Sequence, residues 1–290
     1  MKVKENNFLE DWHTHNKLCH HAEGIIEDYV KEAIRKGLRT IGISDHFPYE
    51  FYTGLDGIPY DEYGMILSET RDYLSTIQEL KAKYKEQINI KCAFEIDFIP
   101  HQVVKLNQQL EKIKDHLDYI LGSIHMLFAP KEPWSFDDSR FLDEFNRYES
   151  VDDVYFHYYD SIILMITSSD FDFDIVSHLD LPKKFNKFPE HKELVMEKVV
   201  EVLEYIKKQN LVVEINTGGF RKEVHEQYPS IEIIKKIFEL EIPIVLSSDA
   251  HKPSEIAYKF DYMLNILTEI GFTELAHFTQ RKRSIITINR

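Results

Sequence analysis

The sequence predicts a single β/α barrel. Short apolar runs alternate with longer amphipathic runs along the chain, which is the pattern of repeated strand–helix units. Seven candidate strands can be counted, and a helical stretch follows each of them, which favours a barrel over a doubly wound sheet. A length of 290 residues suits one such barrel. Because no linker, repeat or low-complexity tract interrupts the pattern, we expect residues 1–290 to form one domain.

The candidate strands are short apolar runs bounded by turn residues or helical stretches. In chain order they are Phe8–Trp12, Thr40–Ser44, Ile88–Ile96, Tyr119–Ser123, Asp174–Ser177, Leu211–Asn216 and Ile242–Ser247. The first predicted helix carries an apolar stripe from Ile25 to Ile34, and Gly37 is its expected C-terminal cap. Other helices are predicted over Val103–Leu117 and Leu194–Ile206, from Pro229 to near Leu240, and from Pro253 to near Gly271.

Two long connections follow predicted strands, over Phe47–Asp61 and Met126–Ser150. The second is rich in aromatic and acidic residues. Loops after the strands of a β/α barrel build its functional sites, so both segments are candidate walls of a pocket.

Composition narrows the function classes. The chain has 35 basic and 50 acidic side chains, and its formal charge of −15 argues against nucleic acid as a partner. The only short basic tract is Arg281–Arg283. Two cysteines, Cys19 and Cys92, imply no disulfide framework and suit a reducing cytoplasm. Residues 1–7 lack an apolar signal core and no apolar run is long enough to span a bilayer, so we expect a cytoplasmic protein.

Metal-ligating residue types gather at the carboxyl ends of the predicted strands. His13 and His15 are two residues apart after the first strand, so both side chains point to one face. Histidine and carboxylate residues follow or end the other strands in the same way, and a barrel places its chemistry at that end. The candidate metal ligands are His13, His15, His21, His46, Glu95, His125, His178, Asp249 and His251.

Seven imidazoles and two carboxylates exceed the four ligands of one zinc ion, so the set predicts two or three divalent ions. Zinc, iron and manganese all suit these ligands. The resulting positive charge favours an anionic substrate despite the acidic surface. His20 is an alternative to its neighbour His21, and Asp45 is either a catalytic acid or a residue that orients a ligand. The six histidines expected at the surface or in packing are His101, His116, His157, His191, His225 and His277.

A series of short motifs covers nearly the whole chain. They are Asp11-Trp-His-Thr-His15, Cys19-His-His-Ala22, Ile41-Gly-Ile-Ser-Asp-His46, Phe94-Glu-Ile-Asp-Phe-Ile-Pro100, Leu121-Gly-Ser-Ile-His125, Asp174-Ile-Val-Ser-His-Leu-Asp180, Glu214-Ile-Asn-Thr-Gly-Gly219 and Ser247-Ser-Asp-Ala-His251. In this order they resemble the polymerase-and-histidinol-phosphatase (PHP) superfamily, and in particular its monofunctional histidinol-phosphatases.

The resemblance implies a distorted seven-stranded barrel with a trinuclear metal site. One ion would resemble a site of His13, His15, Glu95 and Asp249, a second a site of Glu95, His125 and His178, and the third a site of His21, His46 and His251. Glu95 would bridge the first two. The position of the family's ligand before an alanine selects His21 over His20.

The resemblance also implies a phosphatase that converts histidinol phosphate to histidinol in histidine biosynthesis. Two basic residues would hold the phosphate. The first corresponds to Arg221 and the second to Lys183 or Lys184, of which we choose Lys184. An arginine is common at the second position, and a lysine there loses the bidentate fork. The loop residues Trp134, Phe136, Asp137 and Asp138 are candidates to receive the cationic end of this substrate.

Three alternatives stay open. The chain could hydrolyse another small phosphate ester or a nucleotide, or it could be a non-catalytic binding module that keeps the barrel. The amidohydrolase class also places a His-x-His pair after its first strand, but the extra ligands after the first two strands disfavour it. We expect a small phosphorylated substrate and neither nucleic acid nor membrane as a partner, and a homo-oligomer is left open.

Overall fold

The structure, a computed structural model, describes residues 9–52, 55, 57–128 and 133–288. Its centre is a sheet of seven parallel strands in the order β1-β2-β3-β4-β7-β8-β9. The strands are β1 (Glu10–Asp11), β2 (Thr40–Ile43), β3 (Asn89–Asp97), β4 (Tyr119–Ser123), β7 (Ile175–Val176), β8 (Val212–Asn216) and β9 (Ile244–Ser247). Beyond the ends of β1 and β9, Thr14 and Ala250 form a parallel bridge. The sheet is therefore a nearly closed barrel, which confirms the predicted fold class.

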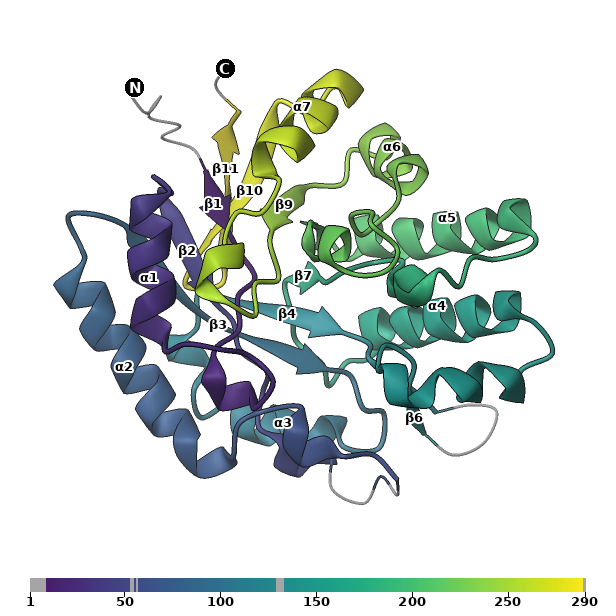
Figure 1. Ribbon diagram of the computed structural model, residues 1–290, viewed down its shortest axis with the longest axis horizontal. Coiled ribbons are helices and arrows are strands. Elements are labelled where there is room, and N and C mark those ends of the chain that lie inside the picture. Colours follow the sequence, from purple (N-terminus) through teal and green to yellow (C-terminus); the bar gives the residue numbers. More distant parts are fainter. Residues whose placement is uncertain (1–8, 53–54, 56, 129–132, 289–290) are drawn as a thin grey trace.

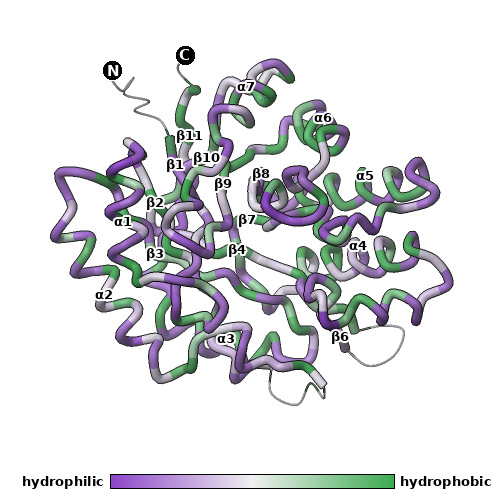
Figure 2. The backbone as a smooth tube through the Cα atoms, in the orientation of Figure 1, coloured by the Kyte–Doolittle hydropathy of each residue, from purple (hydrophilic) through white to green (hydrophobic). Residues whose placement is uncertain are grey.

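Seven α-helices of the described chain surround this barrel (Figure 1). They are α1 (Ile26–Arg35), α2 (Thr70–Lys83), α3 (Val103–Leu110), α4 (Val151–Thr167), α5 (Lys192–Lys208), α6 (Ile231–Glu239) and α7 (Phe260–Ile270). Hydrophobic and hydrophilic residues alternate along these helices in Figure 2. Such amphipathic helices bury one stripe against the strands and leave the other in solvent. None of the described helices is both long and apolar enough to cross a bilayer.

The seven predicted strands are confirmed, since in chain order each overlaps one of the seven strands of the barrel. Phe8, the predicted start of the first strand, lies outside the described residues. The predicted helix cap is also confirmed, because Gly37 has a φ of 74° and donates its backbone N–H to the carbonyl of Ile34 at 3.0 Å. A positive φ of this kind is easily adopted by glycine after a helix.

Two predicted helix boundaries are wrong. The stripe over Val103–Leu117 is not one helix, because α3 ends at Leu110 and a 3-10 turn over Lys114–His116 follows it. Pro253 does not open α7 but a separate 3-10 turn, Pro253–Glu255. Between that turn and α7, Lys259 has a left-handed φ of 55°, which a continuous right-handed helix cannot contain.

Two antiparallel hairpins were not predicted. One is β5 (Met126–Leu127) with β6 (Trp134–Ser135), in the second long connection. The other is β10 (Glu274–Thr279) with β11 (Lys282–Thr287), after α7. Phe278 of β10 packs edge-on against Trp12, with ring centroids 5.9 Å apart. Both belong to an apolar cluster with buried strand residues, among them Ala93, Tyr119, Leu121, Ile175, Val212 and Val245.

Alternation along the strands explains where the polar site begins. Ala93 and Glu95 are two residues apart on β3, as are Val212 and Glu214 on β8, so each pair shares one face. The first member of each pair belongs to the apolar cluster, and the second is a buried carboxylate. The same face is thus apolar where the strands begin and polar where they end.

Candidate metal centre

The nine predicted ligands lie together at the carboxyl ends of the barrel strands. Glu95 belongs to β3, and the other eight side chains are carried by the segments that directly follow β1, β2, β4, β7 and β9. Because the strands are parallel, these segments all leave the barrel at the same end. The structure therefore gathers residues that are separated by more than 200 positions in the sequence.

Glu95 is the centre of this group. Its side chain is 1% exposed, and its two carboxylate oxygens face two different sets of imidazoles. Distances from Oε2 are 3.2 Å to His13 Nε2, 3.4 Å to His15 Nε2 and 3.1 Å to His46 Nδ1, and those from Oε1 are 2.8 Å to His178 Nε2 and 3.5 Å to His125 Nε2. A carboxylate in this position can bridge two cations.

A second group of nitrogens shares His15 and His46 with the set around Glu95 Oε2. Ligand atoms of His15, His46 and His251 lie within 4.8 Å of one another. The ring of His21 is beside them, with its centroid 5.2 Å from that of His46 and 5.0 Å from that of His251. Asp249 Oδ1 approaches His15 Nε2 to 3.2 Å.

The donor set fits divalent metal ions. His13 Nε2 lies 3.0 Å from His15 Nε2, and His125 Nε2 lies 3.1 Å from His178 Nε2. Imidazole nitrogens aimed at each other need a shared proton or a shared cation between them, since two lone pairs repel. Buried imidazoles combined with carboxylates are ligands typical of zinc, iron and manganese.

Three further carboxylates hold the imidazoles from behind. Glu214 Oε1 lies 2.7 Å from His13 Nδ1, and Asp97 Oδ1 lies 2.7 Å from His125 Nδ1. Asp45 Oδ1 lies 3.3 Å from His15 Nδ1. Each such contact fixes the Nδ1–H tautomer and directs Nε2 toward the centre. Asp45 is fully buried and also accepts the backbone N–H of His46, so its geometry favours the orienting role over that of an acid.

Glu214 and Asp97 were not among the predicted site residues. Both belong to the motifs given above. Asp97 is two residues after Glu95, and Glu214 is two residues before Asn216, where β8 ends. A carboxylate on the barrel face of a strand, where an apolar residue is expected, was the signal that could have found them.

Both central carboxylates are ionised. Burial raises the pKa of Glu95, but His13, His46 and His125 outweigh it and hold that pKa well below its usual range. Burial and the neighbouring imidazoles act in the same opposed way on Asp249, whose pKa is also well below its usual range. Two negative charges, a buried one on Glu95 and a partly buried one on Asp249, thus lie among the imidazoles, where they attract cations.

Cys19 and His20 lie close by but do not fit as ligands. The Cys19 thiol is occupied as a donor to the carbonyl of Asn16 at 3.1 Å, and burial raises its pKa to about 11. His20 and His21 are both exposed, but His20 Nδ1 lies 2.5 Å from the carbonyl oxygen of Asp61 and its ring faces Tyr49, with centroids 6.4 Å apart. His21 is the member of the pair beside the other imidazoles.

The three predicted phosphate-binding residues differ in their surroundings. Arg221 Nη2 donates to the carbonyls of Ser248 and Asp249 at 2.8 Å, and its buried Nη1 has no hydrogen-bond partner among the described residues. Lys184 Nζ lies 3.0 Å from Asp137 Oδ2. Lys183 is 1% exposed and lies between two carboxylates, Glu226 at 2.7 Å and Asp180 at 3.0 Å, which makes it less suitable than Lys184 or than Arg221, whose Nε lies 3.5 Å from Glu255.

The predicted role of the second long connection is wrong in its aromatic part. Trp134 and Phe136 are each 1% exposed, because they pack into the core with Phe145 and Tyr158. The two aspartates of this segment are already paired, Asp137 with Lys184 and Asp138 with Arg140 and Tyr63. Residues 53, 54, 56 and 129–132 of the two long connections lie outside the described residues.

Removing a carboxylate behind an imidazole is expected to weaken metal binding while the fold persists. Glu214→Gln and Asp97→Asn should each lower metal affinity about 10- to 100-fold, since such partners orient the ligand. Metal titration against a competing chelator measures this effect. The matched control is Asp152→Asn, because Asp152 Oδ2 lies 2.7 Å from His191 Nδ1 in a similar pair remote from the centre. Equal affinities in all three variants would contradict the orienting role.

Comparison with known proteins gives a consistent result. The family model described as PHP domain matches residues 11–218. A Deinococcus radiodurans protein assigned as a histidinol-phosphatase is 30% identical over 266 residues, which are 91% of this chain and 94% of that protein.

Two crystal structures share the fold. One, a Listeria monocytogenes protein assigned as a histidinol phosphatase, superposes with a TM-score of 0.82 at 26% identity and covers 88% of this chain and 99% of its own. The other is histidinol phosphate phosphatase from Lactococcus lactis, complexed with zinc, L-histidinol and phosphate. It superposes with a TM-score of 0.77 at 20% identity over 95% of this chain and 98% of its own.

Proposed function

The chain belongs to the PHP domain family, and we propose that it is a metal-dependent phosphomonoesterase that hydrolyses histidinol phosphate to histidinol and phosphate. The observation that carries the proposal is the position of Glu95, whose two oxygens face separate sets of imidazoles at one end of the barrel. Several cations held side by side suit an anionic ester. The names of the relatives supply the substrate.

The nine proposed ligands can be divided among two or three ions. We propose that His13, His15, Glu95 and Asp249 hold the first, that His125 and His178 share Glu95 with the second, and that His21, His46 and His251 hold the third. Zinc, iron and manganese suit these ligands. Divalent ions held by these residues would lower the pKa of bound water and stabilise negative charge on phosphoryl oxygens. The protein's part is to fix the ligands, and Asp45, Asp97 and Glu214 do this through Nδ1 of three imidazoles.

Arg221 is the proposed phosphate-binding residue of the chain. Its Nη2 is anchored on the backbone of Ser248 and Asp249, directly beside a proposed metal ligand. This anchor leaves Nη1 buried without a partner among the described residues, and an unpaired buried guanidinium nitrogen is costly. A phosphoryl oxygen would satisfy it with a charge-assisted hydrogen bond. Lys184 would add a second positive charge if substrate displaces its contact with Asp137.

A panel of phosphate esters tests the proposed substrate. Purified protein loaded with zinc or manganese is expected to release phosphate from histidinol phosphate with a kcat/KM at least about 100-fold above that for nucleotides and sugar phosphates. A flat profile, or a preference for another ester, would leave a phosphatase of this family but reject histidinol phosphate as its substrate. A protein that binds metal and hydrolyses none of them would be a binding module.

The domain organisation, the cellular location, the oligomeric state and the absence of a nucleic acid partner stay predictions. We propose that residues 1–290 form one domain, which a core running from Leu9 to Leu275 supports. The cytoplasmic location, the homo-oligomer left open and the absence of a nucleic acid partner rest on the sequence. The acidic surface that disfavours nucleic acid does not oppose the proposed substrate, because the cations act locally.

A further inference from the structure

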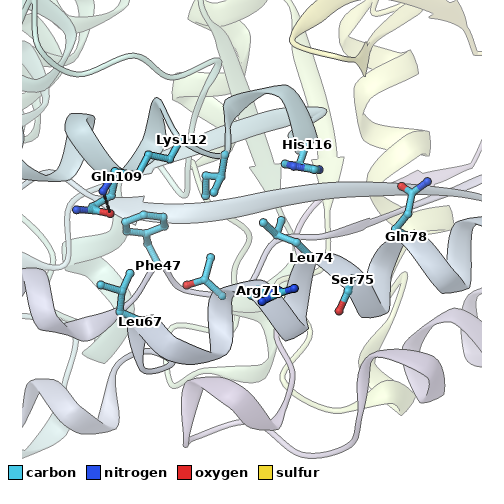
Figure 3. A pocket seen from close by; sticks show the side chains of 11 residues that line it. Phe47, Leu67, Arg71, Leu74, Ser75, Gln78, Gln109, Lys112 and His116 are labelled. Carbon is cyan, nitrogen blue, oxygen red and sulfur yellow. Dashed lines mark hydrogen bonds between the residues drawn. The ribbon is translucent and has the colours of Figure 1, made fainter.

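A groove separate from the metal centre lies between α2 and α3. Its volume is about 770 Å³, which is in the range of small-molecule sites. Figure 3 shows Arg71, Leu74, Ser75 and Gln78 of α2 along one side, with Gln109, Lys112 and His116 opposite. None of the nine proposed metal ligands is among the eleven residues that line it.

The floor of this groove is apolar. Phe47, which is 2% exposed, lies at one end together with Leu67, and Leu74 and Ile113 continue the apolar surface. Leu67 is 39% exposed although it is a large apolar side chain. An apolar surface of this kind, ringed by polar side chains, is typical of a ligand-binding groove.

The rim of the groove is basic. Arg71, Lys112 and His116 line it, whereas no aspartate or glutamate does, although the chain has 50 acidic residues among 290. Within the part of the chain that the structure describes, the side chains of Arg71 and His116 have no hydrogen bond or ion pair. Lys112 donates only to Gln109 Oε1 at 2.9 Å, a contact drawn in Figure 3. Three basic side chains thus face one groove without acidic partners in its lining, so the groove favours an anion.

A buried hydroxyl in the lining lacks a partner. Thr70 stands at the start of α2 and is 8% exposed, and its Oγ1 has no hydrogen-bond partner among the described residues. A buried hydroxyl left unpaired costs free energy. Thr70 belongs to the lining, but Oγ1 itself is buried, so a rotation of the side chain would be needed to present this hydroxyl to a ligand in the groove.

We propose that the groove between α2 and α3 binds a small amphiphilic anion. Its anionic group lies near Arg71 and Lys112, and its apolar body lies on Phe47, Leu67 and Leu74. None of the proposed metal ligands lines the site, so binding there can be measured separately from the phosphatase reaction.

Isothermal titration of the full chain with decanoate, a carboxylate with an apolar tail, tests this proposal. Wild-type protein is expected to bind one decanoate and to bind inorganic phosphate at least tenfold more weakly, because phosphate lacks the apolar body. The double variant Arg71→Gln, Lys112→Gln is expected to raise the Kd for decanoate about tenfold or more. Both positions are exposed, so the fold should persist, which the thermal midpoint checks.

The matched control is the double variant Lys207→Gln, Lys208→Gln at the end of α5. It changes the net charge equally at two exposed positions outside the groove. Its Kd for decanoate should equal that of wild type. Absence of decanoate binding by wild type at millimolar concentrations would overturn the proposal, as would equal Kd values in the two double variants.

Discussion

Glu95→Gln is expected to abolish phosphatase activity, with kcat/KM for histidinol phosphate reduced about 1,000-fold or more. Glutamine keeps the shape of the side chain but removes the charge that faces five imidazoles. The two ions that share this carboxylate would then lose their common ligand. Steady-state kinetics and elemental analysis of the purified variant measure both effects, and we expect the metal content to fall together with the activity.

Glu86→Gln is the matched control for this variant. Glu86 lies in the exposed turn after α2, and its only described contact is with Lys85 at 3.8 Å. The same chemical change there should leave activity and metal content as in wild type. A Glu95→Gln protein that is folded, loaded with metal and fully active would contradict the bridging role.

Arg221→Ala is expected to weaken the recognition of phosphate. A hydrogen bond to a charged group contributes about 1.5–3 kcal/mol, so kcat/KM should fall about 10- to 150-fold. The inhibition constant of inorganic phosphate should rise by a similar factor, because the product carries the same oxygens. Arg221→Lys should recover part of the loss, since it keeps the charge but not the fork.

The inhibition constant separates this role from a structural one. Arg221 also supports the backbone of Ser248 and Asp249, so a fall in kcat with unchanged phosphate inhibition would indicate misplacement of Asp249 instead. Arg283→Lys, at an exposed arginine bonded to Asn210, is the matched control for the conservative change. It should leave the inhibition constant unchanged.

The sequence predicted the barrel and the gathering of the ligands for one physical reason. Parallel strands of a β/α barrel end on the same side, so residues placed after each strand must lie near one another whatever their separation in sequence. His13 and Asp249 illustrate this, since they lie on opposite ends of the chain and 4.0 Å apart at His13 Nε2 and Asp249 Oδ1. To predict which residues meet, it was enough to locate the strand ends. The alternation of short apolar runs and longer amphipathic runs indicates these positions.

Packing that depends on partners from elsewhere could not be read in the same way. Trp134 and Phe136 belong to a segment whose composition suits a pocket wall, but partners on α4 and the preceding turn bury them. The pattern of the strand that contains Glu214 indicates that this residue is buried, but it does not predict that its carboxylate contacts His13. The start of α7 was misplaced because a proline and a serine are equally suited to open a 3-10 turn.

The most direct test of the account is phosphate release from histidinol phosphate by one preparation, measured with its metal content before chelation, after chelation and after readdition of zinc or manganese. We expect activity to disappear as the divalent ions are removed and to return in proportion to the ions rebound. Full activity in protein stripped of divalent ions would contradict the proposal that residues 13 to 251 form a catalytic metal centre.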